Sequence, residues 1–312
     1  KRKEALVGTT WAFTARQFAF SNGYEPRDVY ISTNKFDLNL KTEHDLQYST
    51  PPSAGDIVNI IIESGVLVSS TSTATYALVN PNTWAAGVII NLIIESGAIV
   101  AGRGGDGGRG GYGYTVYSTT SGYVIVYYDD GQKGFDGGSA IHAQYPINIE
   151  NNGGIFAGGG GGGGSGGVII SNAAGFHSVS GCGGGGGWPL GVGGRAGRID
   201  NTDTATADYN IGSGYGAMFI GNAGYNASST FGSGAAGRDI LPSTGSDAHA
   251  GRGGNGGDYD TASVGGASSG GSAPYGIWVG NGGNGGNAGD YAINGNSFIT
   301  WIATGTRYGA IV

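Results

Sequence analysis

The hydrophobic positions between residues 51 and 100 fall into a repeated pattern. Residues 59–68 read NIIIESGVLV, and residues 91–100 read NLIIESGAIV, 32 positions later. A looser copy, INIENNGGIFA, covers residues 147–157. Each copy joins two apolar runs through a glycine, which predicts a strand, a turn and a second strand. Repeats of this kind are typical of stacked β units that bury their faces only against one another.

Shorter strand-like patterns lie near both ends of the chain. The alternation FDLNL at residues 36–40 predicts a half-buried strand, and FITWI at residues 298–302 predicts another. Residues 11–20 are aromatic enough to belong to a core or an interface. The longest apolar run, residues 88–94, is far shorter than the roughly 20 residues that a membrane-spanning helix needs.

Glycine follows a different period in the second half of the chain, where it recurs around every third residue. The clearest tracts are RGGDGGRGG at 103–111, RGGNGGD at 252–258 and NGGNGGN at 281–287. A polyproline-II helix has three residues per turn and no internal hydrogen bonds, so its amides and carbonyls point outward. Buried polar groups need partners, and neighbouring glycine helices can supply them because no Cβ holds the backbones apart.

The period therefore predicts a bundle of polyglycine-II helices that bond through their main chains. The residues between the glycine pairs should form stripes on the outer edge of this bundle. Tracts without such residues, namely 158–164, 166–167 and 183–187, should lie in the interior. A flexible glycine linker is the alternative, although aromatic-rich segments between the tracts argue against it.

Composition removes several other architectures. The chain has 69 Gly among 312 residues, and Gly disfavours a helix by roughly 1 kcal/mol relative to Ala, which excludes a mainly helical protein. A collagen is also excluded, because collagen needs Gly at every third position together with abundant Pro, and this chain has only 8 Pro. Its 18 Tyr, 10 Phe and 5 Trp, with only 12% charged residues, are unlike a disordered chain.

We therefore expect an all-β or irregular fold, in which short β-strand repeats lead into the glycine bundle with long intervening loops. Composition divides the chain into four regions. These are an N-terminal β segment, expected to be a collar or a connection to the rest of a longer protein (1–50), a β-repeat region (51–101), a glycine-rich region with variable loops (102–295) and a C-terminal strand (296–312). The chain begins with Lys1, and we expect it to be a fragment or processed product.

The charge and the cysteine content of the chain exclude several kinds of partner and site. The net charge of −7 lacks the basic footprint that nucleic-acid binding requires, so we expect no nucleic-acid partner. Cys182 is the only cysteine, which excludes an intrachain disulfide and a cysteine zinc cluster.

Motifs for cofactors and metals are weak. Matches to GxGxxG begin at Gly102, Gly251 and Gly280, but such matches are expected by chance at this glycine content, and no helix is predicted after them. Residues 253–258 resemble a calcium-binding nonapeptide, yet Asp260 stands at the next apolar position. We expect no metal and no cofactor.

Catalytic signals are equally weak. None of the histidines lies in a nucleophile-elbow context such as GxSxG, and Cys182 has no identifiable activating partner. Asp129 and Asp130 are expected in a turn before Gly131, and His142 is expected to be a packed structural residue. We therefore expect no enzymatic activity. The four histidines are His44, His142, His177 and His249.

Aromatic residues gather in the segments between the glycine tracts, together with Ser, Gly and Asn. This is the composition of antibody-like contact loops, and Tyr and Trp dominate interface hot spots. Packing of these rings on the glycine scaffold is the alternative. The candidate contact residues are Tyr112, Tyr114, Tyr117, Tyr123, Tyr127, Tyr128, Phe176, Tyr209, Tyr215, Phe219, Tyr225, Tyr259, Tyr275 and Trp278.

The motifs also carry a family resemblance, over roughly residues 55–312. IENNGGIFAG at 149–158, running into the long glycine tract, and FITWIATGTRYGA at 298–310 resemble the glycine-rich C-terminal region of central tail-tip (host-specificity) proteins of lambda-like siphophages. The X-Gly-Gly tracts with variable intervening segments are similar to the long-tail-fibre adhesins of T-even phages.

This resemblance implies a non-enzymatic receptor-binding protein at a virion tail tip or tail fibre. It would dock on a Gram-negative outer-membrane protein, such as a β-barrel porin or transporter, or on lipopolysaccharide. The tail-tip family implies a homotrimer, whereas the T-even adhesins imply a single-chain glycine bundle. The alternatives are a polysaccharide-binding or depolymerising tailspike-type protein and a structural or ice-binding glycine-rich protein. An ice-binding face would carry repeated Thr or Ala, whereas the stripes here are Arg, Asp and Asn.

Overall fold

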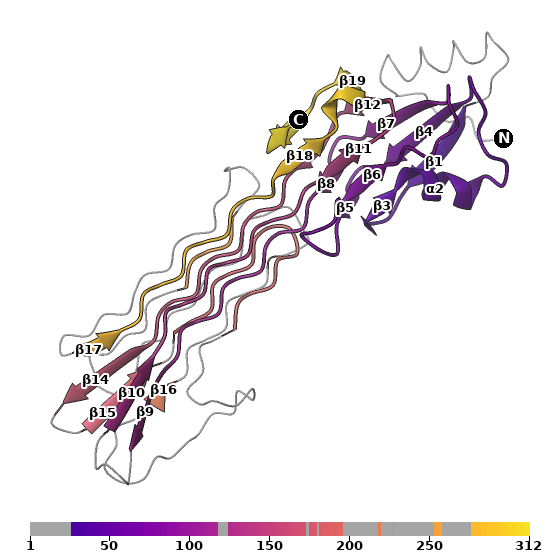
Figure 1. The fold of residues 1–312 in the computed structure, drawn as a ribbon. Helices are drawn as coiled ribbons and strands as arrows, with labels where there is room; N and C mark the ends of the chain where they lie inside the picture. Colours follow the sequence, from indigo (N-terminus) through magenta and orange to yellow (C-terminus); the bar gives the residue numbers. More distant parts are fainter. Residues whose placement is uncertain are drawn as a thin grey trace.

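The computed structural model has a head of β-strands, a narrow stem and a tip with further strands at the far end (Figure 1). It describes residues 26–117, 124–172, 175–179, 181–195, 218–219, 227, 253–257 and 276–312. In these residues the structure is almost entirely β and irregular, as expected, with the one α-helix α2 (Leu40–Gln47).

The head consists of three parallel five-stranded sheets that the chain visits in turn, so that it forms five stacked coils of a β-solenoid. The first sheet contains β1 (Arg27–Ile31), β4 (Ile57–Ile62), β7 (Ile89–Ile94), β12 (Ile147–Asn151) and β19 (Ile299–Ala303). The second contains β2 (Lys35–Phe36), β5 (Leu67–Ser69), β8 (Ile99–Ala101), β13 (Gly154–Phe156) and β20 (Thr306–Tyr308). The third contains β3 (Leu38–Asn39), β6 (Leu78–Asn80), β11 (Ile141–Ala143), β18 (Tyr291–Asn294) and β21 (Ala310–Ile311).

The repeated strand, turn and strand of the sequence is confirmed, and each copy lies one coil above the last. Ile60 pairs with Leu92 and Leu92 with Ile149, and all three side chains are fully buried in the core. The turns contain Gly65 at φ 79° and Gly97 at φ 85°, backbone conformations that favour glycine. Aligned apolar strands thus account for the head.

The strand expected at residues 36–40 is only partly correct. Asp37 has φ 52° and separates β2 from β3, and Leu40 already begins α2. The Asp37 carboxylate accepts hydrogen bonds from Thr71 and Thr75, which hold this corner. Residues 11–20 lie outside the described part of the chain. The strand expected near residue 300 is present as β19.

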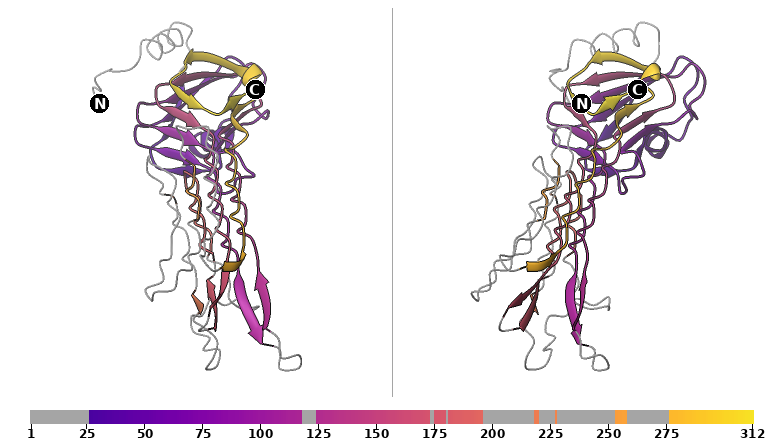
Figure 2. Two further views of the ribbon diagram at one scale, coloured as in Figure 1. Left: turned by 90° about the vertical axis from the view of Figure 1, so that its left-hand side faces the viewer. Right: turned by 60° about the vertical axis from the view of Figure 1, so that its left-hand side comes forward.

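The stem grows from a single corner of the solenoid, between the second and third sheets. In coil 3 the chain leaves β8 and returns to β11 after residues 102–140, and in coil 4 it leaves β13 and returns to β18 after residues 157–290. In coil 2 the same corner is closed by the short connection 70–77. The stem is therefore built from two insertions into successive coils (Figure 2).

Main-chain hydrogen bonds between glycine-rich segments hold the stem together. Within the described part of the chain, the central segment, residues 158–167, bonds to five other segments. Those neighbours are 102–111, 131–138, 181–188, 253–257 and 280–289. Along each interface the bonds recur every third residue: the amides of Gly158, Gly161 and Gly164 donate toward 131–138, for example, at 2.8–2.9 Å.

Close backbone approach explains why the central segment is glycine. A Cβ on Gly161 would lie 1.9 Å from the Asp106 carbonyl oxygen, and one on Gly162 would lie 2.0 Å from that of Gly254. A Cβ on Gly163 would lie 1.9 Å from the Gly283 carbonyl oxygen. Successive residues face different neighbours, so no position of the turn has room for a side chain.

Burial confirms the expected interior and outer edge. Residues 158–164, 166–167 and 183–187 are buried, whereas Asn281, Asn284 and Asn287 are exposed. Arg103, Asp106 and Arg109 are half-buried between buried glycines. The division at residues 50, 101 and 295 stays a prediction; the solenoid draws its strands from residues 27–101, 141–156 and 291–311.

Candidate functional site

At the end of the stem opposite the head, the described residues of the tip form six short strands (Figure 1). The antiparallel pair is β9 (Gly113–Tyr117) and β10 (Val124–Tyr128). A four-stranded sheet has the order β16-β15-β14-β17, with β14 (Val168–Asn172), β15 (Gly175–Val179), β16 (Met218–Phe219) and β17 (Gly276–Val279). The strand β9 lies against β14 and β15, so the two groups are neighbours.

The stem positions these strands because they continue its glycine segments. Where stem and tip meet, the amide of Asp129 donates to the Tyr112 carbonyl at 2.9 Å, and that of Gly167 donates to the Asp129 carbonyl at 3.3 Å. The amides of Gly181 and Gly280 add bonds of 2.7 and 2.8 Å to segments 102–111 and 158–167. A bonded cross-section of the stem thus fixes the base of the tip.

Strand register assigns the tyrosines of the β9–β10 pair to its two faces. Tyr114 lies opposite Tyr127, whereas Tyr117 lies opposite Val124 and Tyr128 opposite Gly113. Because successive residues of a strand alternate between faces, Tyr114 and Tyr127 share one face and Tyr117 and Tyr128 share the other.

The four-stranded sheet brings two further candidates to one face. Phe176 pairs with Ser171, and Trp278 pairs with Ile169, two residues before Ser171 on β14. Phe176 and Trp278 therefore share a face, and Phe219, which pairs with Val179, is placed on the opposite one.

The candidate contact residues are described to different depths. Tyr112 is half-buried at the junction of stem and tip. The backbone places Tyr114, Tyr117, Tyr127, Tyr128, Phe176, Phe219 and Trp278 on tip strands. Tyr123, Tyr209, Tyr215, Tyr225, Tyr259 and Tyr275 lie outside the described residues. Which of these residues contact a receptor stays a prediction.

The polar residues weighed for chemistry have structural partners. His142 stacks on Tyr76 with ring centroids 4.6 Å apart, and its burial lowers the pKa of the imidazole. Asp130 accepts the amide of Asn281 at 2.6 Å. Cys182 is buried in the stem, and its amide donates to the Ser165 hydroxyl at 2.7 Å. Within the described ranges, no group of three or more His, Cys, Asp or Glu could hold a metal ion.

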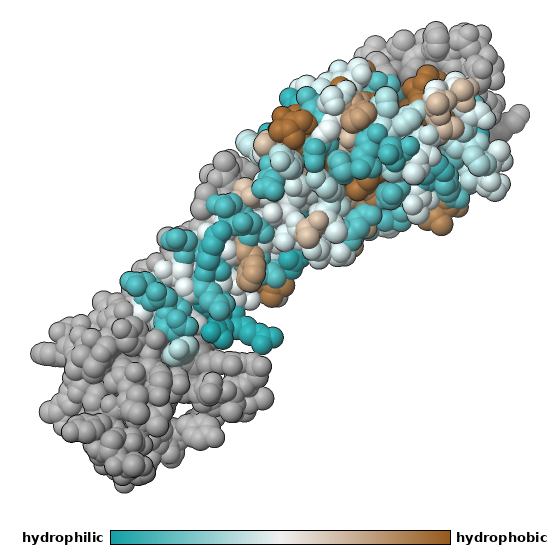
Figure 3. Space-filling view, viewed as in Figure 1, coloured by the Kyte–Doolittle hydropathy of each residue, from teal (hydrophilic) through white to brown (hydrophobic). Residues whose placement is uncertain are grey.

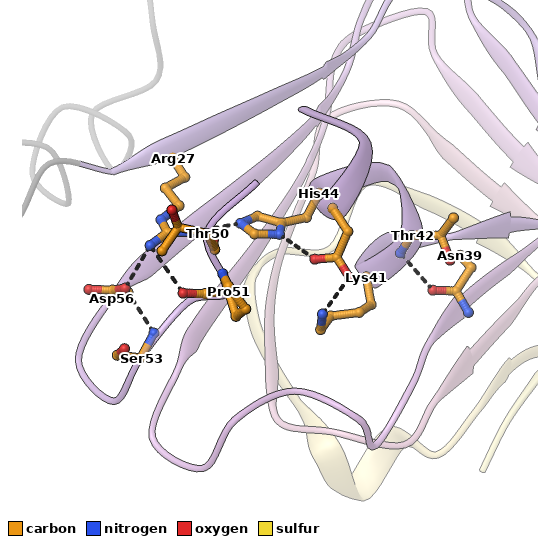
Figure 4. A network of polar contacts seen from close by, with 10 residues as sticks. Arg27, Asn39, Lys41, Thr42, His44, Thr50, Pro51, Ser53 and Asp56 are labelled. Carbon is orange, nitrogen blue, oxygen red and sulfur yellow. Dashed lines mark hydrogen bonds and ion pairs between the residues drawn. The ribbon is translucent and has the colours of Figure 1, made fainter. Parts of the chain in front are cut away.

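A polar network in the first coil was not predicted from the sequence (Figure 4). Arg27 forms an ion pair with Asp56 at 3.1 Å and donates to the Thr50 carbonyl oxygen. His44 is fully buried on α2, stacks on Tyr48 and lies 2.9 Å from the Asp45 carboxylate. These contacts join β1 and α2 to the residues that lead from α2 into β4, so we interpret the network as structural.

Sequence reasoning also missed a stem segment. Residues 131–138, GQKGFDGG, carry a glycine at every third position, 131, 134 and 137, and a Cβ on each of these would meet a carbonyl oxygen of the central segment. The three-residue spacing of these glycines was the available signal. It was overlooked because the glycines are separated by the larger residues Gln132, Lys133, Phe135 and Asp136.

On the face shown in Figure 3, hydrophilic residues dominate the described part of the stem.

Comparisons with known proteins bear on this arrangement. The family model described as "Phage tail fibre adhesin Gp38" matches residues 26–312. A solved structure, "Crystal structure of the gp37-gp38 adhesin tip complex of the bacteriophage S16 long tail fiber", is similar at 23% sequence identity and a TM-score of 0.46. It covers 98% of this chain and 94% of that chain. No curated protein matches significantly. In the described residues, no helix is long and apolar enough to cross a membrane.

Proposed function

Because this chain belongs to the phage tail fibre adhesin Gp38 family, we propose that it attaches the phage to a Gram-negative outer-membrane protein through its aromatic tip. Its place is the virion, at a tail tip or tail fibre. The observation that carries the proposal is the stem, whose periodic main-chain bonds hold the tip strands away from the head.

The proposed mechanism separates scaffold from contact surface. We propose that the stem segments are polyglycine-II helices, and their bonds require almost no side chains. The tip residues can then change without unfolding the scaffold, a common arrangement for loops that carry function. A pre-organised tip also loses less conformational freedom on binding. Tyr and Trp offer large contact areas at low entropic cost.

The partners follow from the same division. We propose that the tip binds a β-barrel porin or transporter, with lipopolysaccharide as an additional contact, and that the head joins the adhesin to a tail-fibre protein. A homotrimer at the tail tip stays a prediction, and one chain already supplies all the stem segments described above. Adhesion, rather than catalysis, is the function that membership of this family supports.

The opposite faces of the β9–β10 pair supply a matched test. We expect one of the two variants Tyr127→Ala and Tyr117→Ala to weaken binding to host cells about 30-fold or more, which corresponds to the 2 kcal/mol of an interface hot spot. The other should bind nearly as the parent does. Binding is measured by competition between purified protein and phage, and melting temperatures are recorded in parallel.

Each result has a clear meaning. Loss of binding with an unchanged melting temperature supports a contact role, whereas loss of both indicates that the ring packs on the scaffold. A pull-down from outer-membrane extract then identifies the receptor. New reducing ends after incubation with host polysaccharide would instead support the depolymerase alternative.

A further inference from the structure

The last stem segment, residues 280–289, contains two Asn-Gly pairs whose asparagines lie on the outer edge of the bundle. They are Asn281–Gly282 and Asn284–Gly285; both asparagines are exposed, whereas Gly282 is half-buried and Gly285 is buried. We propose that these two asparagines are sites of spontaneous deamidation that alters this edge of the stem. The inference concerns the stem and does not depend on which receptor the tip binds.

The chemistry requires only water. The backbone nitrogen of Gly285 attacks the side-chain carbonyl carbon of Asn284, a C–N bond forms, and the side-chain nitrogen leaves as ammonia. Water then adds to either carbonyl of the resulting five-membered imide and opens it to aspartate or isoaspartate. Glycine favours the first step because it has no Cβ to shield the nitrogen or restrict the backbone.

Among the described residues, the hydrogen bonds of this segment leave the attacking nitrogens without an acceptor. The amides of Gly283 and Gly286 donate to the central segment at 2.8 and 2.7 Å. Those of Gly282 and Gly285 have no acceptor among the described residues. The side-chain amide of Asn281 lies 3.5 Å from Asp130, whereas that of Asn284 has no polar contact in the described part of the chain.

The head contains the same dipeptide twice, but there both partners are held. The Asn152 side chain donates to Glu150 at 3.0 Å, and the amide of Gly153 donates to the Asn151 side chain at 3.1 Å. In Asn294–Gly295, the asparagine donates to the Tyr76 hydroxyl at 2.7 Å and the glycine amide donates to the Val312 carbonyl at 2.9 Å. These two pairs have the same Asn-Gly sequence as those of the stem, but their side chains or backbone amides are held by hydrogen bonds.

Deamidation would change both the charge and the backbone of the stem edge. The carbonyls of Asn281 and Asn284 accept the amides of Gly131 and Gly134 at 2.8 and 2.9 Å. Isoaspartate lengthens the main chain and so breaks the three-residue register of these bonds. A new carboxylate at position 281 would lie beside Asp130, whereas one at position 284 is in register with Lys133. A virion does not replace its proteins, so such changes accumulate.

Peptide mapping by mass spectrometry tests the proposal on the full chain. The protein is incubated folded in mildly alkaline buffer, and in parallel unfolded in urea. We expect the folded sample to deamidate at Asn281 and Asn284 several-fold faster than at Asn152 and Asn294, and the unfolded sample to show no such preference. Equal rates at the four sites in the folded protein, or the same preference in both samples, would overturn it.

Two aspartate variants test the structural consequence separately. Asn281→Asp should lower the melting temperature because its carboxylate meets that of Asp130, whereas Asn284→Asp should leave it nearly unchanged. The Asn284→Gln variant, which closes a larger ring only slowly, should remove the mass change at that site. Equal melting temperatures for both aspartate variants would overturn the charge argument.

Discussion

The head and the stem solve the same problem, the stacking of extended chain segments, by opposite means. In the head, apolar side chains such as Leu92 fill the space between the sheets. In the stem, residues such as Gly161 have no side chain, and the backbones themselves meet at hydrogen-bonding distance. The head therefore depends on side chains of the right volume, whereas the stem depends on their absence.

This difference determines what each region can vary. Protein cores tolerate exchanges that conserve volume. The central glycines of the stem tolerate no added atom. The outer residues of the stem and the residues of the tip, by contrast, contribute little to the packing of the stem. A protein whose contact surface must change is well served by such a stem, because its stability resides in main-chain atoms that every residue shares.

The largest effect is expected from a side chain placed inside the stem. In Gly161→Val, the added atoms would overlap the Asp106 carbonyl oxygen, which belongs to backbone and cannot move aside. Overpacking an ordinary core already costs about 1–3 kcal/mol, so we expect the stem bonds around residue 161 to be lost. Hydrogen exchange should show unprotected amides in segments 102–111 and 158–167.

The matched control lies on the outer edge of the same bundle. Asn284→Ala changes an exposed residue of segment 280–289 and should leave stem amide protection as it is in the parent. The comparison of head and stem fails if Gly161→Val retains the protection of the parent.

The next largest effect is expected in the head. Leu92→Ala removes a fully buried side chain from the middle coil and should cost about 2–5 kcal/mol of unfolding free energy. Leu92→Ile, which conserves volume, should cost less than about 1.5 kcal/mol. Denaturant unfolding followed by far-UV circular dichroism measures both. Similar losses for the two variants would show that volume does not govern this core.

The two regions also differed in how far the sequence predicted them. The period of glycine predicted the glycine bundle, its interior and its outer stripes, apart from segment 131–138, because close backbone packing requires a glycine at each contact position. The stacked repeats gave the strands of the solenoid. The common corner was not predicted, since nothing in the sequence ties residues 102–140 and 157–290 to the same edge. Asp37 was missed because hydrogen bonds from Thr71 and Thr75, distant in sequence, fix its backbone.

The tip was predictable only as a composition. Tyr, Ser and Gly between glycine tracts indicated contact segments, but the pairing of Tyr114 with Tyr127 required the strand register.

A row of asparagines in the head was also predicted only in part. Asn148 donates to Asn91 at 2.9 Å, and Asn91 donates to Asn59 at 2.8 Å. The repeat predicted the asparagines at equivalent positions, but not that their amides would bond from coil to coil.

The smallest effect is expected from lowering the pH, which should reduce the stability of both regions. One carboxylate of each region, Asp136 in the stem and Asp37 in the head, allows the comparison. The Asn287 amide donates to Asp136 in the stem at 2.7 Å and lowers the pKa of that carboxyl; burial raises it, and Lys133 at 3.0 Å lowers it further. In the head, burial alone would raise the pKa of Asp37, but hydrogen bonds from Thr71 and Thr75 outweigh it and the pKa is lowered. Both carboxylates are therefore more acidic in the folded protein than in the unfolded chain.

A lowered pKa stabilises the fold above the unfolded value, near 3.9 for Asp, and this contribution is lost as the pH falls through the folded value. The melting temperature of the parent should therefore drop below about pH 4, and Asp136→Asn and Asp37→Asn should each drop less steeply. Hydrogen exchange in the same pH series should locate the loss at segment 280–289 for Asp136 and at residues 70–77 for Asp37. If both variants follow the parent's acid curve, these hydrogen bonds contribute no pH-dependent stability to either region.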